Sequence, residues 1–297
     1  MRTFLRYTCL TLSFCFIVHT NLAASTEKKD ERMLIQESVP FLEPDAKLGW
    51  RNKPQFDDFF PNKHQKHVAR YTINALGERI SADKNAASES SVTVWVVGDS
   101  SPFGFGINNE DTFTEKLSEH YDSKLEIRNM SVVGYRSPQV IKLLKAQLKE
   151  NNQNPDIIIL WCGFNDLIEL RYNKLIEKRL TYYSLKSNVV DIIKMCRRRK
   201  ISLILNTLPS YEDIDLLNKY NTWLLAKHAP QSGIYTNDVQ ERFYILKSKN
   251  LFASIDDHIS QKLNFDMHIH PSVRGHKVIA KMLTQLIDEI TAEEEKE

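Results

Sequence analysis

Polar residues that could do chemistry follow three strand-like stretches of the sequence, and a further set precedes a helix-like stretch near the C-terminus. They form the clusters Gly98-Asp99-Ser100, 129–135, Gly163-Phe164-Asn165-Asp166 and 266–270. Together they supply a serine, an asparagine, histidines, acids and glycines. A serine hydroxyl is a weak nucleophile until a base removes its proton, and histidine is the usual base because it titrates near neutral pH. The residue types therefore fit acyl transfer.

Each role in acyl transfer has a candidate in these clusters. Ser100 is the candidate nucleophile and His270 the candidate base, with His268 as the other histidine within the same cluster. Asp266 could hold the imidazole in the productive tautomer. The oxyanion of the tetrahedral intermediate needs N–H donors, which the Asn165 side chain, the Gly134 backbone and the Ser100 backbone could supply.

The elements that must position these clusters alternate along the chain. The strand candidates are residues 92–97, 125–130, 157–161 and 202–206, and the helix candidates are residues 112–120, 138–149, 184–199 and 272–290. Residues 92–97 form a nearly continuous apolar run, which is typical of a strand buried on both faces. The alternation predicts an α/β fold with a doubly wound parallel sheet, in which chemistry collects at the carboxyl ends of the strands.

The same clusters resemble the motif blocks of the SGNH (GDSL-type) hydrolases, which supply Ser, Gly, Asn and His. The matching positions are Ser100 in Gly98-Asp99-Ser100, Gly134 five residues after Asn129, Asn165 in Gly163-Phe164-Asn165-Asp166, and His270 before Pro271. The resemblance runs from about residue 92 to the last helix candidate. It implies a three-layer, flavodoxin-like α/β fold and an acyl-enzyme mechanism that needs no cofactor.

The sequence departs from the family pattern at two positions. Pro102 stands where Thr or Ser is common, although Gly104 keeps the usual glycine. The family often has Asp three residues before the histidine, but here that residue is Met267 and Asp266 lies one position further back. Either the loop brings Asp266 to His270, or the site is a Ser-His dyad.

The N-terminal third of the chain predicts export and an appended arm. Arg2 and Arg6 precede an uncharged, mainly apolar stretch, and Ala23-Ala24-Ser25 offers small residues for cleavage. The apolar stretch is shorter than the ~20 residues that a membrane span needs. We expect a signal peptide over residues 1–25 and a secreted or periplasmic protein, with an uncleaved membrane anchor as the alternative and the only route to membrane association.

Residues 26–91 are expected to form an irregular N-terminal arm and linker, and residues 92–297 the catalytic domain. The arm resembles the lead-in of some bacterial members of the family through residues 44–50 (PDAKLGW) and 74–79 (NALGER). These stretches are weak signals singly, but they stand in the right order before Ser100.

Charge and cysteine content limit the partners. Lys and Arg total 40 and Asp and Glu total 38, so no strongly basic domain is present and nucleic acid is not an expected partner. The basic run 197–200 closes a helix candidate, where cations meet the helix dipole favourably. Beyond the signal peptide, Cys162 and Cys196 could form one disulfide or stay as buried thiols.

Other chemistries fit the sequence less well. Asn109 stands where a dinucleotide fingerprint needs its third glycine, and Pro102 replaces the last glycine of a Gly-x-Ser-x-Gly elbow. A metal could be bound by three histidines and an acid: His268, His270, His276 and Asp266. That arrangement would leave Ser100 and Asn165 without roles, so we expect neither a metal nor a cofactor.

Several neighbours of the motifs have structural interpretations. Asp99 and Asp166 are expected to fix loops by bonding nearby backbone. His276 is expected to pack at the start of the last helix. The aromatic residues after the motifs could line an acyl pocket or pack in the core; they are Phe103, Phe105 and Tyr135.

The expected function is hydrolysis of carboxylic esters, of the esterase, lipase or carbohydrate deacetylase type, on a small-molecule or carbohydrate ester. One alternative is an acyltransferase that passes the acyl group to a sugar with the same catalytic residues. The other is a non-catalytic, carbohydrate-binding envelope protein on the same fold. Intact Ser100, Asn165 and His270 argue against the latter.

Overall fold

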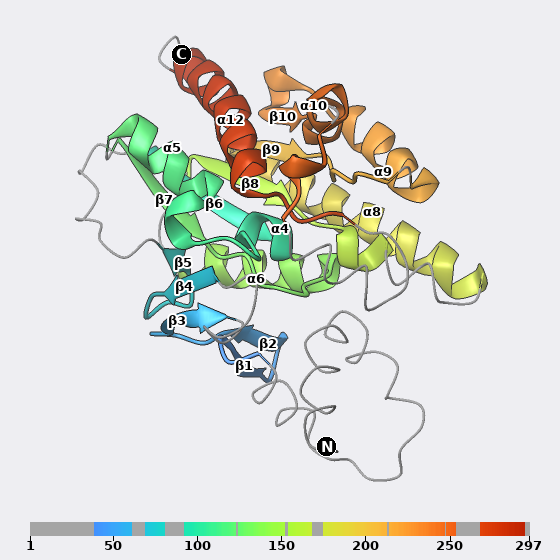
Figure 1. Ribbon diagram of the computed structural model, residues 1–297. Helices are drawn as coiled ribbons and strands as arrows, with labels where there is room; N and C mark the ends of the chain where they lie inside the picture. Colours follow the sequence, from blue (N-terminus) through green and yellow to red (C-terminus); the bar gives the residue numbers. More distant parts are fainter. Residues whose placement is uncertain are drawn as a thin grey trace.

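The computed structural model describes most of the chain as one sheet with helices on both faces (Figure 1). The described residues are 39–60, 69–80, 92–122, 124–151, 154–167, 175–212, 214–246, 248–253 and 268–294. Three predicted features lie outside these ranges: the signal peptide at residues 1–25, the linker at 82–91 and the acid Asp266.

The central sheet has eight strands in the order β10-β9-β8-β6-β7-β5-β4-β3. Its parallel part consists of β6 (Val92–Gly98), β7 (Leu125–Asn129), β8 (Ile157–Trp161), β9 (Ser202–Asn206) and β10 (Ile234–Asn237). Within this parallel part, β6 comes first in the chain, β7 pairs on one side of it, and β8, β9 and β10 follow on the other side. This is the doubly wound, flavodoxin-like order, whose switch point lies beside β6. The predicted fold class is confirmed, and β10 was not predicted.

Apolar side chains hold the strands in the interior. All five residues of β8 are buried, as are the last five of β6. A strand that is apolar on both faces must be covered on both faces, because each face removes its side chains from water only by packing against helices. The nearly continuous apolar runs therefore placed these two strands at the centre of the sheet.

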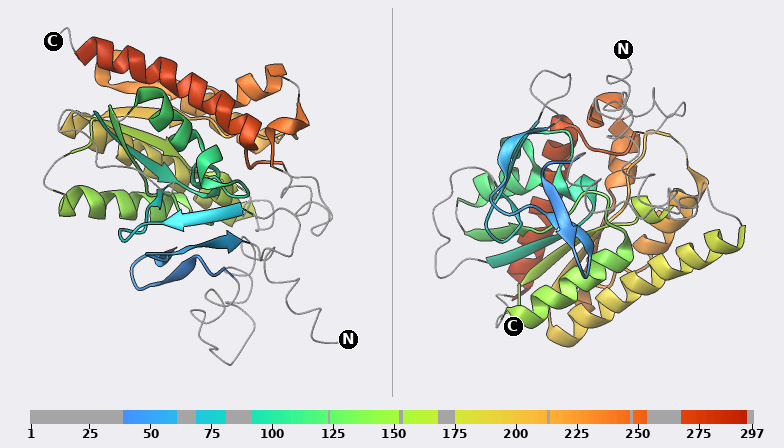
Figure 2. Two further views of the ribbon diagram at one scale, coloured as in Figure 1. Left: turned by 60° about the vertical axis from the view of Figure 1, so that its left-hand side comes forward. Right: turned by 90° about the horizontal axis from the view of Figure 1, so that it is seen from below.

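Helices cover both faces and make three layers (Figure 2). On one face α5 (Phe113–Tyr121) packs against α12 (Val273–Glu294), and on the other α6 (Ser137–Glu150) packs against α8 (Leu175–Arg199). These four match the predicted helices, although α8 begins nine residues earlier than residue 184. The three arginines of the basic run close α8, as predicted.

Shorter helices complete the described part of the chain. They are α4 (Ser100–Phe103), α9 (Asp215–Leu225), α10 (Val239–Leu246) and the 3₁₀ turns η2 (Asn109–Asp111), η3 (Pro230–Ser232) and η4 (Lys249–Leu251).

The described residues of the N-terminal arm, 39–60 and 69–80, contain five strands, so the expected irregular structure was wrong for these residues. A hairpin of β1 (Leu42–Asp45) and β2 (Gly49–Asn52) is followed by β3 (Asp57–Phe60), β4 (Ala69–Ile73) and β5 (Arg79–Ile80). The last three are antiparallel and extend the central sheet beyond β7, with Arg79 paired to Asn129. Phe41 ties the arm to the domain, since its ring stacks on Phe103 with centroids 5.5 Å apart.

Cys162 and Cys196 are both buried as free thiols. Cys162 lies just after β8, and Cys196 lies in α8. Of the two alternatives left by the sequence, the structure favours buried thiols over a bridge.

Across the described ranges, no helix combines the length and the apolar character that crossing a membrane requires.

Candidate active site

Ser100 lies directly after the central strand β6, as the first residue of α4. Asp99 caps this short helix, because its carboxylate accepts a hydrogen bond from the Ser101 backbone N–H at 3.1 Å. Gly98 is required for close approach of backbones: a Cβ there would lie 2.0 Å from the carbonyl oxygen of Trp161 at the end of β8. The Gly-Asp-Ser sequence therefore turns the chain sharply at the switch point of the sheet.

His270 reaches Ser100 from the segment before α12. Its Nε2 lies 2.9 Å from Ser100 Oγ, and both residues are about 95% buried, with 5% and 4% exposure. The backbone of this segment is anchored, since the Ala253 N–H donates to the His270 carbonyl at 2.7 Å. The Phe105 ring lies beside the imidazole, with centroids 5.3 Å apart. A nucleophile and a base thus meet at hydrogen-bond distance.

His268 makes different contacts from His270, although only one residue separates them. Its Nδ1 lies 2.5 Å from Glu212 Oε1, and its backbone N–H donates to Glu212 Oε2 at 2.8 Å. Glu212 stands in the segment that follows β9. The carboxylate therefore holds the histidine segment by a side-chain and a backbone contact.

His276 is a core residue in α12. It is fully buried, its ring stacks on Phe113, and its Nδ1 accepts a hydrogen bond from the Phe113 backbone N–H at 3.0 Å. Burial lowers the pKa of His276 to about 3, so the ring is neutral. The predicted packing role of His276 is confirmed.

The three histidines that were weighed as metal ligands have three separate partners, namely Ser100, Glu212 and the Phe113 backbone. Within the described ranges, no three side chains from His, Cys, Asp and Glu gather as ion ligands.

Gly134 lies in the segment after β7 and Asn165 in the helical turn 164–167 after β8, and a hydrogen bond joins the two segments. Gly134 follows β7 with φ of +83°, a left-handed conformation that favours glycine. Asn165 follows β8, and its Nδ2 donates to the carbonyl of Tyr135 at 2.8 Å. An amide NH₂ carries two N–H donors, so this bond uses one of them to fix the side chain.

Asp99 and Asp166 fix loops, as predicted. Asp166 accepts hydrogen bonds from the backbone N–H and the hydroxyl of Ser137, at 2.9 and 2.7 Å, and so joins the β8 loop to the start of α6. Burial raises the pKa of Asp166 to about 6 and that of Asp99 to about 7. In both cases burial disfavours the charged carboxylate, and the bonds to Ser137 or Ser101 partly offset this effect.

The aromatic residues after the motifs divide between the two roles left open. Phe103 and Tyr135 are fully buried core residues. Phe105 is half-buried and contacts His270, so of the three it is the one that borders the candidate site.

Sequence reasoning missed three residues around the site. Glu212 holds His268, Arg79 bonds the turn after α4, and Trp50 bonds the Gly134 loop. A signal for Glu212 was present, because it follows the buried strand 202–206 as the other site residues follow theirs. Arg79 and Trp50 stand in the family-like stretches of the arm, but nothing in those stretches indicated which loops they would contact.

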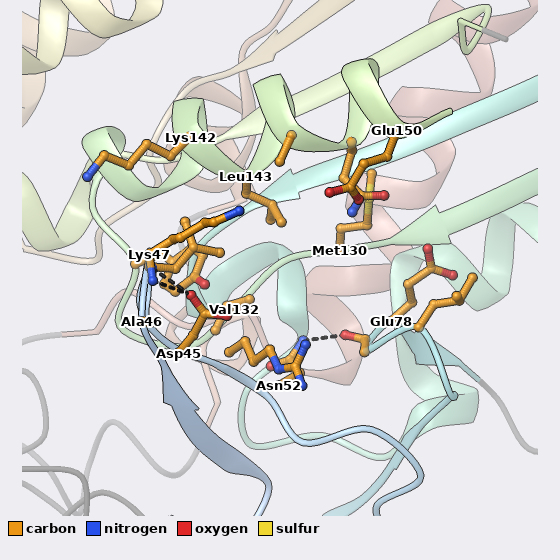
Figure 3. Close-up of a pocket in the computed structure, with 17 residues that line it drawn as sticks. Asp45, Ala46, Lys47, Asn52, Glu78, Met130, Val132, Lys142, Leu143 and Glu150 are labelled. Atoms are coloured by element: carbon orange, nitrogen blue, oxygen red, sulfur yellow. Dashed lines mark hydrogen bonds between the residues drawn. The ribbon is translucent and has the colours of Figure 1, made fainter. Parts of the chain in front are cut away.

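A cavity of about 770 Å³ lies apart from the Ser100–His270 pair, between the β1–β2 hairpin, the turn before β5 and α6 (Figure 3). Its lining includes Lys47, Glu78 and Lys142, and also Val132 and Tyr135, which flank Gly134 in the chain. None of the catalytic candidates lines it.

The fold and the Ser-His pair define a hydrolase of the SGNH type. The sequence profile of the GDSL-like lipase/acylhydrolase family matches residues 96–278, which is more than half of the chain, and the chain belongs to this family. It is accordingly a hydrolase that acts on ester bonds. No curated protein matches the sequence closely enough to count as a relative.

Solved structures share the fold at low sequence identity. A lipolytic G-D-S-L protein from Veillonella parvula is 16% identical, with a TM-score of 0.52 over 65% of this chain and 96% of that one. The protein TesA is 17% identical, with a TM-score of 0.51 over 67% and 99%. An acetylxylan esterase from Geobacillus stearothermophilus is 17% identical, with a TM-score of 0.50 over 66% and 94%.

Proposed function

We propose that the protein is a serine esterase that cleaves carboxylic esters through an acyl-enzyme on Ser100, with His270 as general base. The observation that carries the proposal is the 2.9 Å distance between Ser100 Oγ and His270 Nε2. A base must lie within hydrogen-bond reach of the proton it removes, and this pair satisfies that requirement without further movement. The substrate is a small-molecule or carbohydrate ester.

In the first half of the reaction, Ser100 Oγ attacks the ester carbonyl carbon while its proton passes to His270 Nε2. The tetrahedral intermediate then collapses, the bond to the alcohol oxygen breaks, and the imidazolium returns the proton to that oxygen. In the second half, water gives a proton to His270 and its oxygen attacks the acyl carbon. The bond to Ser100 Oγ then breaks, the carboxylic acid leaves, and His270 returns the proton to Oγ.

The negative oxygen of each intermediate needs donors fixed in advance. We assign this role to the Gly134 backbone N–H and the Asn165 side chain, with the Ser100 backbone N–H as a third donor. The bond from Asn165 to the Tyr135 carbonyl supports the assignment, because it ties the amide to the residue next to Gly134. Asp266 remains the proposed partner of His270, and without it the site works as a dyad.

Asn165→Ala should lower kcat by about 100-fold or more, because removing one oxyanion donor has that typical cost. The KM for a good ester should change little, since the donor acts on charge that develops after binding. Steady-state kinetics with an activated ester, alongside circular dichroism to check the fold, measure the effect. Full turnover in a folded variant would remove Asn165 from the mechanism.

The proposed reaction is tested by profiling the purified protein against acetyl, longer-acyl and sugar esters. Turnover of at least one class is expected, with an acylated Ser100 peptide detected by mass spectrometry after acid quenching. The same assay with an added sugar distinguishes hydrolysis from acyl transfer, because an acylated sugar would appear in place of free acid. Absence of both products and of any reaction with serine-directed probes would favour the carbohydrate-binding alternative.

We also propose that the protein is exported, to the periplasm or outside the cell. Arg2, Arg6, the short apolar stretch and Ala23-Ala24-Ser25 support this proposal. Expressed with its full N-terminus, the mature protein should begin near Thr26 when its N-terminal sequence is determined. A product in the cytoplasm that still begins with Met1 would contradict export, and one in the membrane that begins with Met1 would identify an uncleaved anchor.

A further inference from the structure

Arg79 is a buried arginine in the arm strand β5, and its guanidinium donates hydrogen bonds to the segment that follows Ser100. It is 4% exposed. Its Nη1 donates to the carbonyls of Phe103 and Gly104 at 2.6 and 2.5 Å, and its Nη2 donates to the carbonyl of Ile107 at 2.6 Å. These carbonyls belong to the end of α4 and the turn that follows it.

The charge of Arg79 is stabilised mainly by oxygens and aromatic rings. Nε donates to the Asn109 side chain at 3.2 Å, and the guanidinium carbon lies 4.6 and 4.7 Å from the ring centroids of Tyr71 and Phe103. Burial lowers the pKa of Arg79 to about 10, so the group remains charged at neutral pH. The planar guanidinium donates to several acceptors at once in a fixed geometry. The compact ammonium group of a lysine cannot reproduce this set of hydrogen bonds.

These bonds act on the helix that begins with Ser100. α4 is only four residues long, so fixing the carbonyls at its end also fixes its start. The Asn129 side chain, paired in the sheet with Arg79, donates to the Pro102 carbonyl at 2.9 Å. Between them, Arg79 and Asn129 hold three consecutive carbonyls of the nucleophile loop, those of residues 102, 103 and 104.

A second arm residue, Trp50 in β2, holds the Gly134 loop. Its indole N–H donates to the Val133 carbonyl at 2.9 Å, and its own carbonyl accepts the Tyr135 hydroxyl at 2.6 Å. The Tyr135 carbonyl in turn accepts the Asn165 side chain. A continuous set of hydrogen bonds thus runs from the hairpin to the proposed oxyanion donors.

We propose that the N-terminal strands are part of the catalytic unit, with Arg79 and Trp50 as positioning residues for the nucleophile loop and the oxyanion loop. This inference rests on the proposed roles of Ser100, Gly134 and Asn165. Both positioning residues lie before residue 96, where the family profile begins. The family's core sequence therefore does not contain everything that sets the geometry of this site.

The test separates positioning from simple stabilisation by counting competent sites and measuring the rate of each one. Arg79→Lys keeps the positive charge but removes the planar guanidinium and its multiple N–H donors. Arg128→Lys is the matched control, because Arg128 is also stacked on a ring, that of Trp95, but bonds Glu78 and Gln147 and neither catalytic loop. Each variant is titrated with a fluorophosphonate probe, and kcat and KM are measured well below its melting temperature.

Positioning predicts that Arg79→Lys keeps a full titre of reactive serines but labels them more slowly, with kcat lower by about tenfold or more and KM nearly unchanged. Arg128→Lys should keep the wild-type rate per site. If Arg79→Lys gives fewer sites that each react at the wild-type rate, the role is stability alone and the proposal is wrong. It is equally wrong if both titre and rate are unchanged.

Trp50→Phe tests the second loop and keeps the proposal testable if Arg79→Lys does not fold. It retains most of the packing of Trp50 but removes the donor to Val133, whereas Trp223→Phe removes an indole from α9, away from both loops. Trp50→Phe should lower kcat per site and Trp223→Phe should not; equal rates would overturn the role of Trp50. A wild-type protein that the probe does not label would instead contradict the proposed function.

Discussion

Ser100→Ala should abolish ester cleavage and all labelling by a fluorophosphonate probe. The expected loss in kcat is on the order of 10⁶-fold, because without the hydroxyl no acyl-enzyme forms and the histidine has no proton to remove. The effect should be chemical and not structural. Ser100 is 4% exposed at the start of a four-residue helix, and alanine fills the same space without the oxygen.

Ser101→Ala is the matched control for this substitution. Ser101 is also buried, but its hydroxyl donates to the Ile269 carbonyl at 3.4 Å, whereas the Ser100 hydroxyl lies 2.9 Å from His270 Nε2. It should retain probe labelling and most of its activity. Equal labelling of wild type and Ser100→Ala would show that the nucleophile is a different residue.

His270→Ala should lower kcat by a comparable amount, because base and nucleophile act as a unit and their losses are not additive. His268 is two positions before His270 and is bonded to Glu212. His268→Ala should therefore lower kcat by less than the ~100-fold that general base catalysis contributes at minimum. Initial rates of ester cleavage and of Ser100 labelling measure both variants. The reverse order of effects would transfer the base role to His268.

The same kinetic measurements test whether Asp266 is the acid that orients His270. Asp266→Ala should reduce kcat substantially if this acid orients the imidazole, and a nearly unchanged rate would describe the site as a dyad. Combining Asp266→Ala with His270→Ala sharpens the result, since two residues that act together should cost no more than His270→Ala alone.

The parallel part of the fold could be predicted from the sequence because strands buried on both faces are nearly continuous apolar runs. Residues 157–161 and 202–206 coincide with β8 and β9. The arm was predicted, but its strands were missed because they are two to five residues long and mix polar with apolar side chains. In Ala69–Ile73, for example, buried positions alternate with more exposed ones. Such strands gain their stability from the sheet that they extend, which local sequence does not reveal.

The Ser100–His270 pairing was likewise predictable from motif order, but the separation of the two histidines was not. On an extended segment His268 and His270 point to the same side, so both were possible bases. In the structure His268 instead contacts Glu212, which lies 56 positions earlier in the chain. Pairings of this kind depend on tertiary contacts that spacing within one motif does not contain.

The distance along the chain between Ser100 and His270 also determines when activity can begin. The two residues are 170 positions apart, and His270 precedes α12, which docks onto α5 through contacts such as the Tyr121 hydroxyl with Asp288. At ordinary synthesis rates of ~5–20 residues per second, the ribosome adds His270 roughly ten to thirty seconds after Ser100. A nascent chain would therefore carry the proposed nucleophile before its proposed base, and we expect ester cleavage only after His270 has been added and has reached Ser100.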